Sequence, residues 1–289
     1  MSRDLTRRGA SAGLLALAAG GTASASAAAP PRRVVSLGAC LDVILMQVAD
    51  RDQIAAVSHF ARDPQISIMA ADAQSLPYTH ETAEEVVALK PDLVLASQRT
   101  ALQARTTLKR LGYRVEAFEV PESVQASLDQ VTRLARLVGH EDRGRAMVAR
   151  IERALAEAAP PPGAPRLPAL IYQHAGLAAG KHTLVSEMME RCGLENVAAR
   201  YGLKKWGNVS LERLLTDPPR VLLLGEPPPG APVSSDRIVM HPALASLEPR
   251  MHRINFPPRL LYCGGPTLIQ TAALLANARR ETQRLLAMG

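Results

Sequence analysis

Aromatic side chains are scarce in this chain, at only 3% of its 289 residues. Proteins that bind single-stranded nucleic acid stack bases on aromatic rings, so the scarcity argues against that function. The formal net charge of +7 does not reverse this argument, because the arginines are scattered along the chain. We therefore expect no nucleic acid among the partners of this protein.

Signatures of metal sites, enzymes and membrane spans are also missing. The three cysteines have no CxxC or other zinc-binding spacing. The sequence contains no GxSxG, HExxH, GxxxxGK[ST] or GxGxxG after an expected strand. His59, His80 and His174 fall in expected loops, without the spacing of a helical or hairpin metal site. No apolar run reaches the roughly 18 residues of a membrane span. We predict a non-enzymatic protein with no resident cofactor or metal.

The first 29 residues have the pattern of a signal peptide. Arg3, Arg7 and Arg8 precede an apolar stretch over residues 12–19, and small residues follow at 23–27. The Arg7-Arg8 pair resembles a twin-arginine signal, whereas the basic region also fits a general secretory signal. Both routes lead to a periplasmic protein, cleaved between Ala25 and Ala29.

Short apolar runs alternate with amphipathic stretches from Arg33 onward, which is typical of strands joined by helices in an α/β fold. The spacing predicts strands at residues 34–37, 54–57, 93–96 and 115–118, then a long helix over 141–158. A proline-rich break at 159–165 follows. The alternation then begins again, with strands at 170–172 and 221–224. Residues 84–95 and 212–223 repeat one pattern, in which a glutamate precedes a proline by seven residues and a strand follows.

Several segments together resemble the class III periplasmic substrate-binding proteins of ABC importers, which receive ferric siderophores, haem and cobalamin. The segments are RVVSL (33–37), VVALKPDLVL (86–95), GYRV (112–115), AGK (179–181), CGLEN (192–196) and WGNVSLE (206–212). The resemblance implies an α/β class fold with an N-terminal lobe (30–138), a bridging long helix (139–160), a C-terminal lobe (161–289) and a ligand cleft between the lobes. It also implies a monomer that delivers a small metal chelate to the membrane subunits of an importer.

Candidate ligand-binding residues lie where expected strands end or where relatives carry aromatic rings. Trp206 matches an aromatic residue that lines the cleft of cobalamin binders, although it could instead cap the second lobe. Arg99 could meet a carboxylate of a siderophore or a haem, or could be a solvated loop residue. The remaining candidates are Phe60, Tyr78, Ser97, Gln98, His174 and Arg259. The polar residue at position 97 favours an iron chelate, with cobalamin close behind.

Cys40 and Cys263 both follow expected strands and are therefore also candidates for the cleft. They could form a disulfide, offer sulfur to a metal, or be small buried residues, and the last reading is favoured for each taken alone. A periplasmic enzyme using a cleft thiol is the alternative function. Cys192 stands where some relatives have a disulfide cysteine, but its usual partner position falls near Ala276.

Glu84 and Glu212 occupy matching positions of the internal repeat. In the family that the chain resembles, one exposed glutamate on each lobe meets arginines of the membrane subunits, which implies a docking role here. Both glutamates also lie near expected helix N-termini, where a carboxylate stabilises the helix dipole, and this structural role is the alternative.

Overall fold

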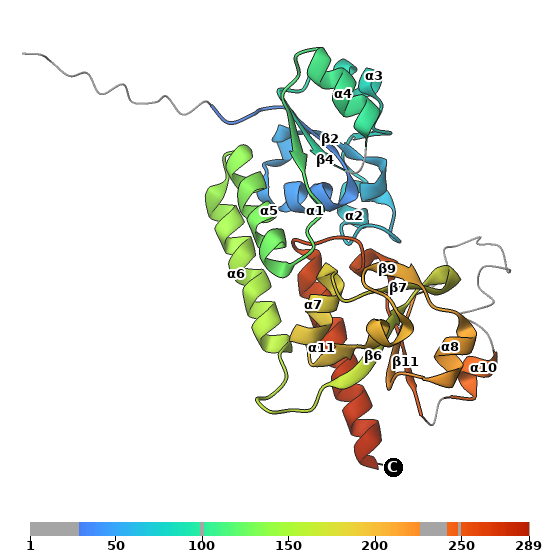
Figure 1. Cartoon of the computed structure of the whole chain (residues 1–289). Coiled ribbons are helices and arrows are strands. Elements are labelled where there is room, and N and C mark those ends of the chain that lie inside the picture. The colour runs from blue at the N-terminus through green and yellow to red at the C-terminus, as the bar shows by residue number, and fades with distance from the viewer. Residues whose placement is uncertain (1–28, 99–100, 226–241, 248–249, 289) are drawn as a thin grey trace, which may run out of the picture.

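The computed structural model describes residues 29–98, 101–225, 242–247 and 250–288. Most of the predicted signal peptide lies outside these residues. Two α/β lobes are bridged by one long helix (Figure 1). We call residues 29–138 the N-lobe and residues 161–288 the C-lobe. Within the described residues, no helix combines the length and the apolarity needed to cross a membrane.

The N-lobe sheet is wholly parallel, with strand order β3-β2-β1-β4-β5. Its strands are β1 (Val34–Leu37), β2 (Ile54–Ser58), β3 (Tyr78–Thr79), β4 (Leu93–Ser97) and β5 (Val115–Phe118). The shorter helices of this lobe are α1 (Ala39–Val48), α2 (Ala70–Ala73), α3 (Ala83–Ala88) and α4 (Leu102–Arg110), with 3-10 turns at Arg51–Gln53 and His59–Arg62. Buried apolar strands of this kind are typical of a parallel sheet covered on both faces. The expected strands of this lobe are confirmed.

The C-lobe sheet is mixed rather than parallel, with order β11-β10-β6-β7-β9 and β8 beside β6. Its strands are β6 (Leu167–Tyr172), β7 (Leu177–Ala179), β8 (Leu194–Asn196), β9 (Trp206–Asn208), β10 (Val221–Leu224) and β11 (His252–Asn255). Its shorter helices are α7 (Leu184–Arg191), α8 (Leu211–Thr216) and α10 (Pro242–Ala245), with 3-10 turns at His174–Gly176, Val197–Tyr201 and Pro258–Leu260. Strand β7 runs antiparallel to both β6 and β9. The short connection after β6 folds directly back as a hairpin, which strict alternation of strands and helices does not predict.

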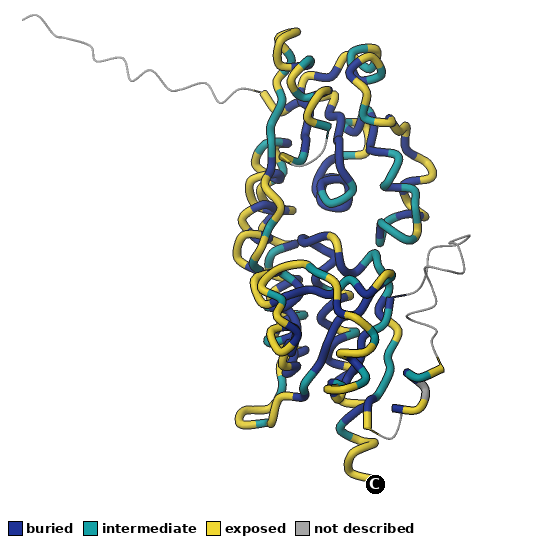
Figure 2. The backbone as a smooth tube through the Cα atoms, turned by 45° about the vertical axis from the view of Figure 1, so that its right-hand side comes forward, coloured by how far each residue is buried: buried dark blue, intermediate teal, exposed yellow. Residues whose placement is uncertain are grey.

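Helix α6 (Glu141–Ala158) bridges the lobes and is flanked by α5 (Val124–Leu137) of the N-lobe and α11 (Thr267–Met288) of the C-lobe. Helix α6 has the predicted bounds and packs against both α5 and α11 (Figure 1). Gly144 makes the close approach possible, because a Cβ atom there would lie 2.4 Å from the Cβ of Ala135. One continuous cluster of buried residues extends from the N-lobe through these helices into the C-lobe. Figure 2 shows buried segments in both lobes. The lobes therefore share a core, which opposes large movements between them.

Candidate functional site

A pocket of about 1070 Å³ lies between the two lobes. The N-lobe lines it with residues at the carboxyl ends of its parallel strands, where open α/β sheets place their ligands. The C-lobe contributes the residues that follow β6, together with the segment before α11. Apolar lining comes from Leu41, Phe60, Ile66, Phe118, Val120 and Leu177. The volume is at the upper end of the range for small-molecule sites, so the pocket suits a large ligand.

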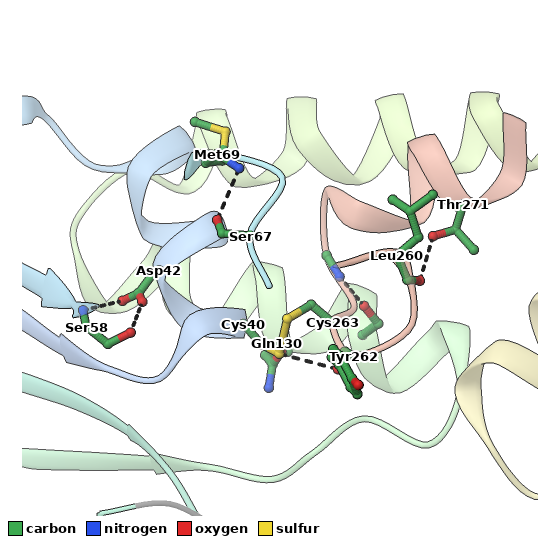
Figure 3. Close-up of a disulfide and its surroundings, with 12 residues drawn as sticks. Cys40, Asp42, Ser58, Ser67, Met69, Gln130, Leu260, Tyr262, Cys263 and Thr271 are labelled. Carbon is green, nitrogen blue, oxygen red and sulfur yellow. Dashed lines mark hydrogen bonds between the residues drawn. A yellow bond between two sulfur atoms is a disulfide. The ribbon is translucent and has the colours of Figure 1, made fainter. Parts of the chain in front are cut away.

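A disulfide bond between Cys40 and Cys263 joins the two lobes at this pocket (Figure 3). Cys40 lies in the first turn of α1 and lines the pocket, and Cys263 is 4% exposed just before α11. Their Cα atoms are 4.9 Å apart. The reading that each cysteine is merely a small buried residue is wrong, because strand-end loops of opposite lobes meet here.

The disulfide removes the thiols that the alternative enzyme function requires. Cys192 is the free cysteine of the described residues, and it is fully buried. Burial raises the pKa of its thiol to about 11, so it is not a reactive thiolate. The described part of the chain also contains no group of three histidine, cysteine, aspartate or glutamate residues that could hold a metal ion.

Further polar contacts hold the lobes together around the pocket. The backbone N–H of Gly265 donates to Oγ of Ser127 at 2.6 Å, beside the disulfide. The carboxylate of Glu187 in the C-lobe accepts a hydrogen bond from the backbone N–H of Val124, at the start of α5. Lys205 Nζ lies 2.7 Å from Oε1 of Glu122 in the N-lobe. The lobes are thus connected by covalent, helical and polar links.

A buried carboxyl group fixes α1 behind the pocket. Asp42 is fully buried, and its Oδ2 accepts a hydrogen bond of 2.5 Å from the hydroxyl of Ser58 at the end of β2 (Figure 3). Burial raises the pKa of Asp42 to about 7, and the serine hydrogen bonds only partly oppose this effect. The carboxyl group therefore joins the first turn of α1 to the strand that leads to Phe60.

Glu81 enters the pocket from a turn with unusual backbone geometry. Its φ of 66° lies in the left-handed region, which is costly for a residue with a side chain. Two hydrogen bonds hold this turn, because the N–H of Glu81 donates to Oγ1 of Thr79 and the Thr79 hydroxyl donates to Glu85. One carboxylate oxygen of Glu81 is buried without a hydrogen-bond partner among the described residues. Burial raises the pKa of Glu81, and His59 partly opposes the shift.

Two buried glutamines face the pocket from opposite lobes. Gln130 on α5 is 8% exposed and donates to the carbonyl of Glu119 at 2.9 Å, while its Oε1 has no partner. Gln173, directly after β6, is 4% exposed, and its Nε2 has no partner. Neither atom has a hydrogen-bond partner within the part of the chain that the structure describes. The two lobes thus supply one unpaired acceptor and one unpaired donor.

Four of the predicted ligand-binding residues line this pocket: Cys40, Phe60, Ser97 and His174. Cys263 is bonded to Cys40. Gln98 borders a neighbouring groove of about 810 Å³ and donates from its side chain to Glu119. Arg99 lies outside the described residues.

Tyr78, Trp206 and Arg259 are not among the residues that line the pocket. The ring of Tyr78 contacts His80 and the guanidinium group of Arg62 instead. Trp206 is 44% exposed on the edge strand β9. Arg259 is partly exposed in the turn before α11, next to the lining residue Pro258.

Four polar residues of the pocket lining are absent from the candidates that the sequence indicated: Glu81, Glu119, Gln130 and Gln173. Two of them could have been found, because Glu119 and Gln173 each directly follow a predicted strand. Glu81 follows β3, whose two residues are too few to give a sequence pattern. Gln130 lies within α5, whose buried face gives no sign of a pocket.

Glu84 and Glu212 occupy equivalent places in α3 and α8. Each is the second residue of its helix and is exposed, and a Thr82 or Ser210 side chain caps the helix start. The internal repeat therefore extends to local geometry. Figure 1 shows α3 in the N-lobe and α8 in the C-lobe, well apart on the molecule.

Comparison with known proteins agrees with this architecture. The profile of the periplasmic binding protein family matches residues 34–249. The chain belongs to the periplasmic binding protein family. Similar solved structures include the periplasmic heme-binding protein RhuT of Roseiflexus sp. RS-1 in apo form, with a TM-score of 0.70 and 21% identity over 87% of this chain and 98% of that one. The vitamin B12-binding protein BtuF of Vibrio cholerae has a TM-score of 0.66 and 17% identity over 88% and 98%. At these identities the likeness shows the shared fold.

Among curated sequences, a cobalamin-binding protein of Halobacterium salinarum is 27% identical over 213 residues. That match covers 72% of this chain and 56% of the relative, so the chain spans about half the length of the curated relative.

Proposed function

We propose that this protein captures a cobalt corrinoid in the interlobe pocket and delivers it to the membrane subunits of an ABC importer. The observation that carries the proposal is a large pocket at the strand ends of both lobes, with an apolar wall and no lysine or arginine among its described lining residues. Haem and many ferric siderophores carry carboxylates or other negative charges, which bind best beside arginine or lysine. A corrinoid with uncharged amide side chains needs no such partner.

The Halobacterium relative is named as a cobalamin-binding protein, which supports the same ligand class. The sequence alone favoured an iron chelate because of polar residue 97 and low aromatic content. Ser97 lines the pocket, but Glu81, Asp63 and Glu119 make its described charged lining acidic. We therefore place the corrinoid ahead of the iron chelate.

Export to the periplasm and docking on an importer complete the proposal. The pattern of residues 1–29 supports export. Glu84 and Glu212 support docking, because two exposed carboxylates at equivalent helix positions can pair with basic residues of a two-subunit partner.

The ligand is tested by the visible absorbance of protein purified from its own cells, since corrinoids, haem and ferric siderophores have distinct bands. A corrinoid spectrum is expected. A haem or ferric-siderophore spectrum would contradict the proposed ligand.

Docking is tested by Glu84→Lys combined with Glu212→Lys. We expect uptake of the corrinoid to be lost while its affinity for the purified protein stays within about twofold of wild type. The paired change Glu152→Lys with Glu157→Lys, at exposed positions of α6, is the matched control. Normal uptake with a lowered melting temperature would instead assign Glu84 and Glu212 to helix capping.

A further inference from the structure

The charged residues among the pocket's described lining are of one sign. Asp63, Glu81 and Glu119 are its described acidic lining residues, and none of its described lining residues is lysine or arginine. A carboxylate that enters an apolar cavity loses hydration, and beside other carboxylates it also meets repulsion. The pocket therefore disfavours a ligand whose periphery carries carboxylates.

The buried glutamines indicate which polar groups the pocket accepts. Gln130 offers an unpaired oxygen acceptor and Gln173 an unpaired N–H donor, and each side chain is more than nine-tenths buried. An unpaired buried polar group is unfavourable until a partner is supplied. A carboxamide on a ligand carries both a donor and an acceptor, whereas a carboxylate offers acceptors only. A carboxamide can therefore serve both glutamines.

Glu81 is held in a turn that hydrogen bonds fix. Its left-handed backbone is held through Thr79, whose hydroxyl donates to Glu85 at 2.6 Å. The N–H of His80 donates to the same Glu85 oxygen at 2.7 Å. The hydrogen bond from Thr79 holds the pKa of Glu85 below its ordinary value, so Glu85 remains an ionised anchor. Left-handed backbone strain in a residue with a side chain clusters at functional sites, where the side chain must point toward a ligand.

We propose that Glu81 is a specificity-determining residue, which accepts hydrogen bonds from carboxamide side chains of the ligand and excludes the corresponding carboxylates. Gln130 and Gln173 bind the same carboxamide periphery from the two lobes. This inference rests on the proposed function, since it concerns which corrinoids enter that pocket. The raised pKa of Glu81 agrees with a carboxylate that lacks a donor until the ligand binds.

The test uses two probes with the same metal and ring. Dicyanocobinamide carries carboxamides on the corrin ring, and dicyanocobyrinic acid carries carboxylates at the same places. Cyanide fills both axial positions of cobalt in each probe, so coordination by the protein does not contribute. Equilibrium dialysis with the purified chain, read by visible absorbance, gives both dissociation constants.

We expect wild-type protein to bind dicyanocobinamide at least 100-fold more tightly than dicyanocobyrinic acid. Glu81→Gln is expected to reduce this preference at least tenfold, whereas the matched control Glu152→Gln, on the exposed face of α6, leaves it unchanged. Gln130→Met and Gln173→Met are expected to weaken binding of dicyanocobinamide more than binding of the acid. Glu81→Ala replaces Glu81→Gln if melting curves show that the latter does not fold.

The outcomes separate this inference from the proposed function. Equal binding of the two probes, or tighter binding of the acid, overturns the charge selection while a corrinoid receptor stands. A preference that Glu81→Gln and Glu81→Ala leave intact overturns the assignment to Glu81. Binding of neither probe overturns the corrinoid function and this inference with it.

Discussion

The N-lobe and the C-lobe repeat one helix-strand pattern but present it to the pocket differently. All strands of the N-lobe sheet point the same way, so its strand-end loops converge and supply most of the described lining. In the C-lobe, β7 and β9 run antiparallel to their neighbours. Trp206 lies on the edge strand β9, and the lining from this lobe comes instead from Gln173, His174 and Tyr262 among others. Strand-end reasoning therefore holds in both lobes, since Gln173 and His174 follow β6, whereas Trp206, which only the resemblance indicated, lies on an edge strand outside the described lining.

The largest effect on stability is expected from replacing Asp42, the buried carboxyl group of the N-lobe. The pKa of Asp42 is about 7 in the folded protein, against 3.8 as its ordinary value. Between these values the folded state holds a proton that the unfolded state has lost, so the free energy of unfolding falls as pH rises from about 4 to about 7. Asp42→Asn removes this titration. We expect the decrease in the free energy of unfolding between about pH 4 and about pH 7 to be roughly 4 kcal/mol smaller in the variant than in wild type. This figure corresponds to a shift of about three pKa units.

Urea unfolding of both proteins at several pH values between 4 and 8 measures this difference. Glu81 has a raised pKa, and Asp50 and Glu85 have lowered ones, but wild type and variant share these groups. They therefore cancel in the comparison. Parallel stability curves for the two proteins would show that Asp42 titrates normally.

The disulfide between the lobes is expected to give the next largest effect on stability. Cys40 and Cys263 are 223 residues apart in sequence, so their bond strongly restricts the unfolded chain. We expect Cys40→Ser with Cys263→Ser to lower the free energy of unfolding by about 2–4 kcal/mol while the fold persists, because α6 and the common core also join the lobes. Urea unfolding with and without a phosphine reductant measures the contribution of the disulfide to the free energy of unfolding. The reductant should destabilise wild type and leave the double variant unchanged, and a wild type indifferent to reductant would refute the bond.

The smallest expected effect is a loss of ligand affinity, which we compare for one aromatic residue of each lobe. Phe60 lines the pocket, whereas Trp206 does not belong to its described lining. We expect Phe60→Ala to weaken binding of cyanocobalamin by roughly 1–3 kcal/mol, the range for loss of a buried aromatic contact, and Trp206→Ala to change it less than threefold. Equilibrium dialysis gives both values. A larger loss from Trp206→Ala would restore the role that its resemblance to cobalamin binders indicated.

The sequence predicted the two α/β lobes, the bounds of α6 and four of the five N-lobe strands in the described residues, because apolar periodicity reports burial in regular elements. It could not place Gln130, which becomes a pocket residue only when α5 packs between the lobes. Nor could it pair Cys40 with Cys263, since contact between distant loops depends on how the lobes dock. The antiparallel strands β7 and β9 were missed because three-residue strands carry too short a pattern.

The central claim is that the interlobe pocket binds a corrinoid. Ala39→Trp tests it most directly, because residue 39 starts α1 at the pocket and an indole there occupies ligand space. Ala146→Trp, on the exposed face of α6, is the matched control. In equilibrium dialysis with cyanocobalamin, we expect one ligand per wild-type or Ala146→Trp chain and at least a 100-fold weaker affinity for Ala39→Trp. Equal binding by all three proteins, or no binding by wild type, would contradict the claim.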